Sequence, residues 1–289
     1  MGENAAGEAT TPFDGLLLDV DDTLVDTRAA MVAAGTAAVA ALWPDVAPEV
    51  HRAAGTHFHQ DPGGYFTKFT TGEMAFAEMR AARVAEMVRA HGLTEVADVA
   101  TRFEEAYRPA FRDSVRLFED VEDLLEQATA AGIRVGALTN SDERATAHKL
   151  ELSGLSQAFV TVMTTDTLGF GKPDPRVFAH ACELLGVAPE RTLCVGDHVE
   201  VDALAATRAG LHGVWLRRPG PGSPRREELA ADDEALARAH GIPVVSSLAE
   251  VGPILTGGHA SRPERPRGPA GLGPGGASGP DLGGGRAGR

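Results

Sequence analysis

The pattern of hydrophobic and polar positions divides the chain into two kinds of region. A short apolar run within residues 14–20 predicts a buried strand, and from about residue 27 to 112 the pattern is helical, with almost no strand signal. After Leu117 the pattern alternates between helices and short apolar strands. The predicted strands are 133–138, 158–163, 192–195 and 213–216, and the helices between and beside them are 121–131, 143–153, 175–185 and 199–209.

Short apolar strands that alternate with helices are typical of right-handed βαβ units, in which helices cover both faces of a parallel sheet. We therefore predict an α/β fold with a doubly wound parallel sheet, built from residues 13–26 and 113–256. The helical region 27–112 interrupts this pattern after the first strand, so we expect it to form a separate domain. Residues 217–240 are polar and predict a loop with a short helix.

The two ends of the chain differ from the rest in composition. Residues 1–12 lack an apolar pattern, and residues 257–289 consist mainly of Gly, Pro and Arg. Segments of this kind bury too little apolar surface to fold, so we predict that both ends are disordered.

The net negative charge of the chain limits the classes of partner that we expect. A formal net charge of −14 argues against nucleic acid or an anionic membrane surface. No apolar run is long enough to cross a bilayer, and the first residues lack the pattern of a signal peptide, so we expect a cytoplasmic protein. The sequence leaves the oligomeric state open.

Polar side chains gather just after the predicted strands. Ligand sites of open α/β sheets form at the carboxyl ends of strands, where loops that are distant in sequence converge. The first such segment places two carboxylates, Asp19 and Asp21, at the end of a buried strand, where uncompensated charge is costly. The four segments are Asp19-Val20-Asp21-Asp22-Thr23, Leu138-Thr139-Asn140-Ser141, Phe170-Gly171-Lys172-Pro173-Asp174 and Val195-Gly196-Asp197-His198-Val199-Glu200-Val201-Asp202.

The residue types in these segments suit phosphoryl transfer. Several carboxylates favour Mg²⁺, a hard cation that takes oxygen ligands. A lysine offers a compact positive charge to a phosphate or to a nucleophilic carboxylate, and a threonine hydroxyl beside backbone N–H groups binds phosphate oxygens. Phosphoryl transfer requires positioning, charge neutralisation, a nucleophile and a proton donor, and these segments provide all of them.

The four segments, in this order, resemble the motifs of the haloacid dehalogenase superfamily, and the Asp-x-Asp-x-Thr form resembles its phosphohydrolase branch. The helical region between the first and second motifs resembles the cap domain of subfamily I. The resemblance covers roughly residues 13 to 255. It implies a Rossmann-like core, Mg²⁺ as cofactor, an aspartyl-phosphate intermediate and a small phosphorylated metabolite as substrate.

The resemblance also implies roles for the two acids of the first motif. Asp19 corresponds to the nucleophile. Asp21 corresponds to the general acid and base, and its backbone carbonyl to a metal ligand. Asp21 has to hold a proton in the first step, and the charge of a neighbouring carboxylate is expected to favour that form.

The remaining motif residues correspond to the phosphate and metal sites. Thr139 and the Asn140 backbone match the phosphate-binding second motif, and Lys172 matches the cation that offsets the substrate's charge. Asp197 matches a direct metal ligand. Asp202 matches the acid that supports the metal site or orients Lys172.

The reaction is less sharply defined than the fold. Asp21 fills a place that a dehalogenase leaves without an acid, which disfavours dehalogenation. A sugar-phosphate mutase of the same superfamily and a non-catalytic binding scaffold stay open as alternatives. The candidates for contact with the leaving group of a substrate are Arg28, Tyr65, Lys68, Arg80, Arg83 and His198.

Overall fold

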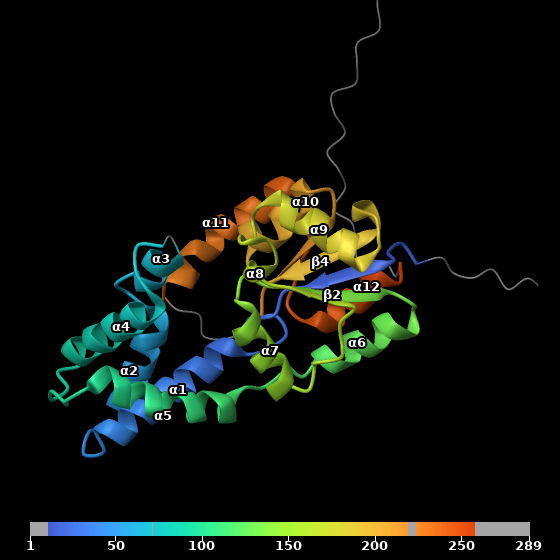
Figure 1. The fold of residues 1–289 in the computed structure, drawn as a ribbon. Helices are drawn as coiled ribbons and strands as arrows, with labels where there is room; N and C mark the ends of the chain where they lie inside the picture. The colour runs from blue at the N-terminus through green and yellow to red at the C-terminus, as the bar shows by residue number, and fades with distance from the viewer. Residues whose placement is uncertain (1–10, 71, 219–223, 258–289) are drawn as a thin grey trace, which may run out of the picture.

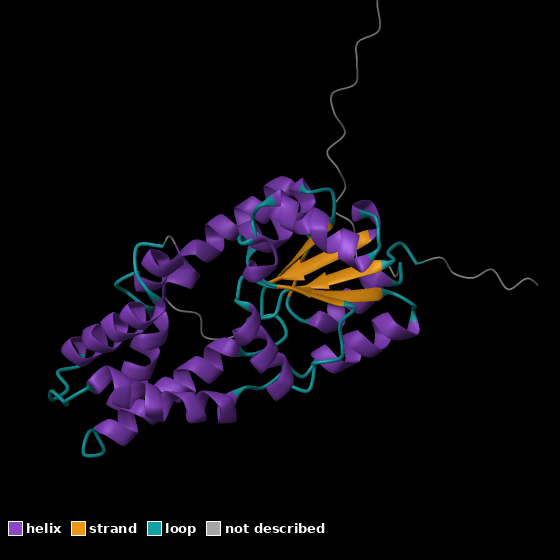
Figure 2. Cartoon of the chain, viewed as in Figure 1, coloured by secondary structure: helices purple, strands orange, loops and turns teal. Residues whose placement is uncertain are grey.

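The computed structural model describes residues 11–70, 72–218 and 224–257. Residues 1–10 and 258–289, which belong to the ends predicted to be disordered, lie outside this part of the chain. The described residues form two parts that lie side by side, a sheet covered by helices and a group of helices without strands (Figure 1, Figure 2). No helix of the described ranges combines the length and the apolar character needed to cross a membrane.

The sheet is parallel throughout and has the strand order β3-β2-β1-β4-β5-β6. Its strands are β1 (Gly15–Leu18), β2 (Arg134–Leu138), β3 (Thr161–Met163), β4 (Thr192–Gly196), β5 (His212–Leu216) and β6 (Val244–Val245). From β1 the chain proceeds outward through β2 and β3, then returns to the other side of β1 at β4. This confirms the predicted doubly wound sheet. It also places the end of β1 at the topological switch point, where ligands bind in such folds.

Helices cover both faces of the sheet, as Figure 1 shows. They are α6 (Val121–Ala130), α7 (Glu143–Leu152), α8 (Thr165–Leu168), α9 (Pro175–Leu185), α10 (Ala205–Arg208), α11 (Pro224–His240) and α12 (Val251–Leu255). Successive strand residues point to opposite faces, so Leu16 and Leu18 join one apolar cluster with residues of α6 and α12. Leu17 joins a second cluster with Phe178 and Leu185 of α9. Both clusters are buried, which accounts for the apolar strand pattern.

Two predicted elements differ from the structure. The helix expected at 199–209 consists of a π-helical segment, Val199–Leu204, followed by α10. Residues 217–240 contain α11, which is longer than the short helix predicted there. The sequence of α11 is rich in charge and has no apolar stripe to indicate its length.

The second part, which we call the helical insert, comprises residues 27–114. Its helices are α1 (Thr27–Leu42), α2 (Pro48–Gln60), α3 (Tyr65–Thr70), α4 (Phe76–Ala90) and α5 (Val99–Ser114). It has its own core, in which Phe58 and Phe103 are fully buried. Helices α1 and α2 cross closely at Gly35 and Gly55, where a Cβ atom on Gly55 would lie 2.4 Å from the Thr36 backbone nitrogen. Glycine is therefore required at position 55 for this crossing.

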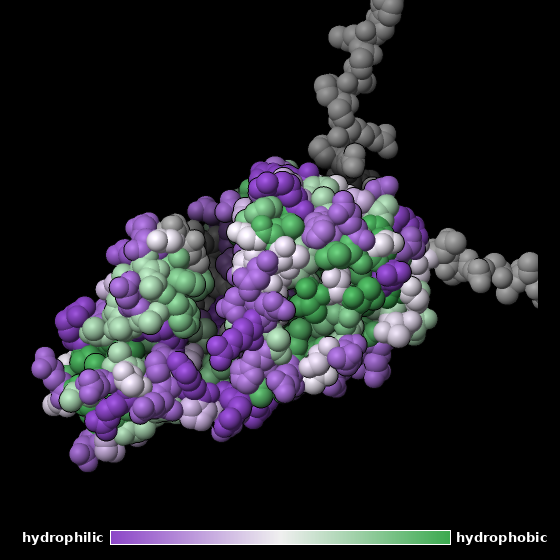
Figure 3. Space-filling model, viewed as in Figure 1, coloured by the Kyte–Doolittle hydropathy of each residue, from purple (hydrophilic) through white to green (hydrophobic). Residues whose placement is uncertain are grey.

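The chain enters and leaves the helical insert through two adjacent backbone segments. Val25 forms an antiparallel bridge with Leu117, and the Asp26 N–H donates to the Arg116 carbonyl at 3.0 Å. The strand arrows in Figure 2 point toward the insert, so the carboxyl ends of the strands face it. Figure 3 shows a groove between the two parts on the face drawn there.

Candidate active site

All four sequence segments meet at the ammonium group of Lys172, which belongs to the third segment and contacts the other three. Lys172 Nζ donates to Asp19 Oδ1 at 2.8 Å, to Asp202 Oδ1 at 2.6 Å and to the Leu138 carbonyl at 2.8 Å. Asp19 follows β1 directly, and its N–H donates to Val195 of β4 at 2.9 Å. The Lys172 side chain is only 2% exposed. Burial lowers its pKa, but the charges of Asp19 and Asp202 outweigh that effect and raise the pKa above its ordinary value.

The second motif holds the backbone of Lys172 in place. Asn140 Nδ2 donates to the Lys172 carbonyl at 2.8 Å, and Asn140 Oδ1 accepts from the Lys172 N–H at 2.7 Å. This pair of bonds explains the glycine before the lysine, because a Cβ atom on Gly171 would lie 2.3 Å from Asn140 Oδ1. Thr139 is buried, and its Oγ1 accepts from the Ser141 N–H at 3.2 Å. The structure therefore shows a positioning contact for the Asn140 side chain that the sequence did not indicate.

Three carboxylates lie close enough to share one cation. Ligand atoms of Asp19, Asp197 and Asp202 all lie within 4.8 Å of one another. Burial, followed by the charges of Asp19 and Asp202, raises the pKa of Asp197 well above its ordinary range. Burial also raises the pKa of Asp19 to about 7, against the lowering effect of Lys172. Three carboxyl groups at this spacing outnumber the single ammonium of Lys172 that contacts two of them, and their oxygen donors fit a hard divalent cation such as Mg²⁺.

The carboxylate of Asp202 differs from the other two in its contacts. Its Oδ1 accepts from Lys172, and its Oδ2 accepts from the His198 backbone N–H at 2.9 Å. The side chain is 2% exposed and extends from the π-helical segment, a kind of distortion that is frequent at functional sites. Of the two alternatives for Asp202, the structure therefore shows the contact with Lys172 directly.

Asp21 lies in a different environment from the one predicted. Its Oδ1 and Oδ2 accept from Lys149 Nζ at 2.5 and 2.6 Å, while Thr27 Oγ1 and Ser141 Oγ donate at 2.6 and 2.8 Å. Burial raises the pKa of Asp21, but the charge and hydrogen bonds of Lys149 outweigh it and hold the pKa below its ordinary value. The expectation that a neighbouring carboxylate keeps Asp21 protonated was wrong, because a lysine is its closest charged partner. The Asp21 carboxylate is also not part of the three-acid group.

Lys149 itself did not enter the sequence-based site. It lies on α7, whose buried residues are Thr146, Lys149 and Leu150. This spacing of three and four residues marks the inner face of a helix. A lysine on that face, just after the second motif, is the signal that would have indicated a buried charge partner.

Two of the proposed leaving-group contacts, Arg80 and Arg83, lie inside the helical insert. Arg80 Nε donates to Glu104 at 2.6 Å, and its guanidinium lies 4.4 Å from the centre of the Tyr107 ring. Arg83 donates to the backbone carbonyls of Phe58 and His59 at 3.0 Å. The prediction that these arginines face a substrate is therefore corrected. They are buried because their planar groups join the aromatic core of the insert to its helices.

The other candidates have these positions. The Arg28 backbone N–H and Nη2 donate to Asp22 at 2.9 and 3.3 Å, so Arg28 is held beside the first motif. On α3, Lys68 Nζ lies 5.2 Å from the centre of the Tyr65 ring. The His198 side chain is exposed next to Asp197. Of this group, His198 lies within the fourth motif and Arg28 lies at the start of the insert beside the first motif, whereas Tyr65 and Lys68 lie on α3 of the insert.

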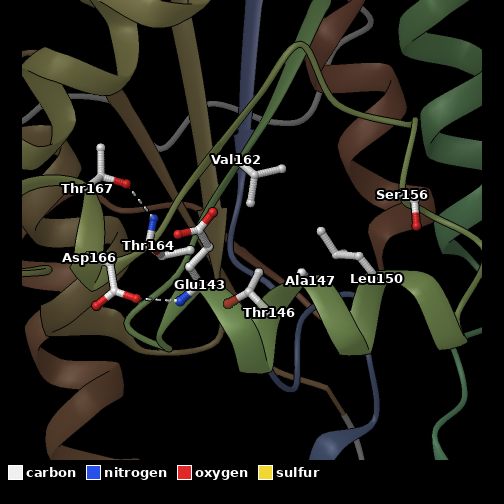
Figure 4. Close-up of a pocket in the computed structure, with 9 residues that line it drawn as sticks. All are labelled: Glu143, Thr146, Ala147, Leu150, Ser156, Val162, Thr164, Asp166 and Thr167. Carbon is white, nitrogen blue, oxygen red and sulfur yellow. Dashed lines mark hydrogen bonds between the residues drawn. The ribbon is translucent and has the colours of Figure 1, made fainter.

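A separate cavity of about 350 Å³ lies outside the acidic group, between α7, β3 and α8 (Figure 4). It is lined by Glu143 and Leu150 of α7, Val162 of β3 and Asp166 of α8, among others. Asp166 Oδ2 accepts from the Glu143 N–H at 2.8 Å at its edge. None of the motif carboxylates or Lys172 lines this cavity.

Comparison with known proteins agrees with this arrangement. The family model described as haloacid dehalogenase-like hydrolase matches residues 13–210. A phosphoserine phosphatase of Thermus thermophilus is 35% identical over 135 residues, which cover 46% of this chain and 54% of that protein. A plasmid-encoded phosphoglycolate phosphatase of Cupriavidus necator is 28% identical over 74% of this chain and 85% of its own length. For the first relatives found, the matched region spans about half of the relative's length or less.

Solved structures show the same fold. A HAD family hydrolase from Deinococcus radiodurans R1, crystallised with bound phosphate and sodium, superposes with a TM-score of 0.61 at 24% identity. It covers 86% of this chain and 97% of its own. The motif order, the doubly wound sheet and the family match together show that this chain belongs to the haloacid dehalogenase-like hydrolases.

Proposed function

We propose that this protein is a Mg²⁺-dependent phosphohydrolase that acts on a small phosphorylated metabolite through an aspartyl-phosphate at Asp19. The observation that carries the proposal is the contact of Lys172 Nζ with Asp19 and Asp202, the two buried members of a three-acid group at the carboxyl ends of β1 and β4. A nucleophilic carboxylate, a fixed cation and a metal-binding set are the parts that phosphoryl transfer needs.

The proposed reaction has two steps. In the first, a carboxylate oxygen of Asp19 forms a bond to phosphorus, the bond from phosphorus to the leaving oxygen breaks, and Asp21 gives that oxygen a proton. In the second, water attacks the phosphorus of the aspartyl-phosphate, Asp21 accepts the water proton, and inorganic phosphate leaves with Asp19 restored. Lys172 keeps the Asp19 carboxylate oriented and offsets the negative charge of the transferred group.

The contacts of Asp21 fit this cycle. In the structure its pKa is below the ordinary value because of Lys149, so it is ionised and ready to accept a proton in the second step. A bound phosphate brings like charge, which raises the pKa of a nearby carboxyl group and favours the protonated form for the first step.

The residues present also suit the proposed cofactor. Asp19 and Asp197 would hold Mg²⁺ through carboxylate oxygens, together with the Asp21 backbone carbonyl, while Asp202 supports the site through Lys172. Bound Mg²⁺ supplies positive charge that reduces the repulsion between Asp19 and an anionic phosphate.

The size of the substrate is proposed from the relatives and from the insert. The named relatives include phosphatases for phosphoserine, phosphoglycolate and glyceraldehyde 3-phosphate, all of which are small phosphorylated compounds. The helical insert faces the carboxyl ends of the strands, a position from which it can act as a cap that limits access to small molecules.

The test is phosphate release from p-nitrophenyl phosphate in the presence of Mg²⁺. We expect turnover by the wild-type protein and a loss on the order of 10³-fold or more for Asp19→Asn, since removal of a nucleophile eliminates the covalent route. Asp113→Asn serves as the control, because its side chain is 73% exposed on α5. Equal turnover by wild type and Asp19→Asn would refute the proposed function.

A further inference from the structure

The carboxylate of Asp21 is held from three directions. Thr27 approaches from the start of α1 in the helical insert, Ser141 from the loop after β2, and Lys149 from α7. Lys149 contacts both oxygens, at 2.5 and 2.6 Å, and so restrains the plane of the carboxylate as well as its distance. The Asp21 side chain is still 30% exposed, so one side of it remains open to a ligand.

The donors of Lys149 are occupied within the protein. An ammonium group has three N–H donors, and Lys149 Nζ lies within hydrogen-bond distance of the two Asp21 oxygens and, at 3.1 Å, of Ser141 Oγ. Its side chain is 7% exposed. Any effect of Lys149 on a substrate is therefore expected to pass through Asp21. Lys172 differs in that it contacts Asp19, the proposed nucleophile.

We propose that Lys149 is a positioning residue that fixes the Asp21 carboxyl group for proton transfer to and from the leaving oxygen, an inference that rests on the proposed function. Without the lysine, the carboxylate keeps the bonds to the hydroxyls of Thr27 and Ser141 but loses the two-oxygen contact that sets its orientation. General acid–base catalysis contributes about 10²–10⁴-fold and depends on a fixed geometry, so part of that factor is expected to disappear.

The experiment compares wild type with Lys149→Met, Asp21→Asn and the double variant on two substrates. Phenyl phosphate has a poorer leaving group than p-nitrophenyl phosphate and needs the proton more. For Lys149→Met we expect kcat to fall about 10–100-fold on phenyl phosphate and less than about 5-fold on p-nitrophenyl phosphate, with KM nearly unchanged. The double variant is expected to lose no more activity than Asp21→Asn alone, because Lys149 acts only through that carboxylate.

A purely structural role for the Lys149–Asp21 ion pair gives a different result. The losses of kcat would then be equal on both substrates, or the loss from Lys149→Met would multiply that from Asp21→Asn, and either result overturns the inference. Lys149→Arg keeps the charge and is expected to recover part of the activity on phenyl phosphate. It also takes the place of Lys149→Met if that variant does not fold, and equal losses on both substrates in the arginine variant again overturn the inference.

A control variant on the same helix distinguishes a failure of the positioning inference from a failure of the proposed function. Arg144→Met changes an exposed cation of α7 and is expected to leave both substrates unaffected. If wild type and Asp19→Asn differ but Lys149→Met behaves like Arg144→Met, the positioning inference fails while the proposed function stands. If Asp19→Asn retains full turnover, the proposed function itself fails.

Discussion

The place of Lys172 depends on contacts that its own backbone makes. Asn140 binds the Lys172 N–H and carbonyl, and the bare backbone of Gly171 lets the two segments approach. A change of this backbone would move the ammonium group away from Asp19 even though no charged residue had been altered.

We therefore predict that Gly171→Ala lowers kcat for p-nitrophenyl phosphate about 10–100-fold, because a misplacement near 1 Å can cost that much in a positioned site. The added Cβ would meet Asn140 Oδ1 at 2.3 Å, whereas at Gly132 a Cβ meets nothing within 4 Å. Gly132→Ala is thus the control. It carries the strain of a positive φ of 70° but is expected to keep kcat. Similar kcat values for the two variants would show that the Asn140 contact does not set the position of Lys172.

For single residues, the sequence predicts which site residues lie close together better than it predicts the electrostatic surroundings of each. Asp19 and Asp202 follow strands of one parallel sheet, and Lys172 follows β3 at one remove, through residues 164–171, so their meeting could be expected from the strand pattern. The lowered pKa of Asp21 could not be expected from the strand pattern, because it depends on how α7 is rotated about its axis. That rotation brings Lys149, rather than an exposed neighbour such as His148, to the inner face of the helix.

Among the elements, the loop after β1 accepts a hydrogen bond from an ion pair between a residue that follows β5 and a residue that precedes α6. Arg218, just after β5, donates to both oxygens of Asp120 and to the Thr23 carbonyl, at 2.8–2.9 Å. Asp120 Oδ2 also accepts from Ser247 Oγ and from the Leu248 N–H. The first motif is thus supported by elements that are distant in sequence.

The pKa of Asp120 sets a pH dependence for this support. Burial raises that pKa, but the hydrogen bonds from Arg218, Ser247 and Leu248 hold it below its ordinary value. A carboxyl with a lowered folded-state pKa stabilises the protein above its unfolded-state pKa of about 3.9, and this stabilisation is lost as pH falls through the folded value. We predict that Asp120→Asn lowers the free energy of unfolding by about 1–3 kcal/mol at pH 7.

The measurement is urea unfolding of wild type and Asp120→Asn between pH 7 and pH 3. The difference in unfolding free energy is expected to narrow as pH falls below about 4. Glu126→Gln, an exposed acid on α6, is the matched control and should show little difference at any pH. A constant difference across this range would contradict the role assigned to the Asp120 charge.

The elements themselves were predictable where a core faces them. The strands and α9 follow apolar patterns, and the structure places them in the two sheet clusters. Helix α11 was underestimated because charged residues dominate it, and the π-helical segment was not foreseen because its sequence pattern is that of an ordinary helix. Local pattern indicates helix or strand, but tertiary contacts decide such distortions.

The whole molecule carries an excess of negative charge, and part of it is concentrated where the two parts face each other. Asp19, Asp197 and Asp202 are brought together by the pairing of β1 with β4, since they follow these two strands. A cation bound there would stabilise the folded protein over the unfolded chain, in which these acids are apart.

We accordingly predict that Mg²⁺ raises the thermal unfolding midpoint of the protein. At 100 times the dissociation constant, the expected stabilisation is about 2.7 kcal/mol. The increase should disappear in Asp197→Asn, and KCl at the same ionic strength should not reproduce it. An equal shift in the variant would mean that Mg²⁺ acts at some other place on the protein.

The pairing of the backbone segments at Val25 and Leu117 has a consequence for the evolution of the protein. Because the backbone enters and leaves the helical insert at adjacent, hydrogen-bonded positions, the two ends of the insert almost coincide. A segment with coincident ends can be exchanged for one of another length or shape without displacing β1 or β2. Recombination at this one junction would give descendants of the protein a different substrate preference, while the reactive residues on the sheet stay unchanged.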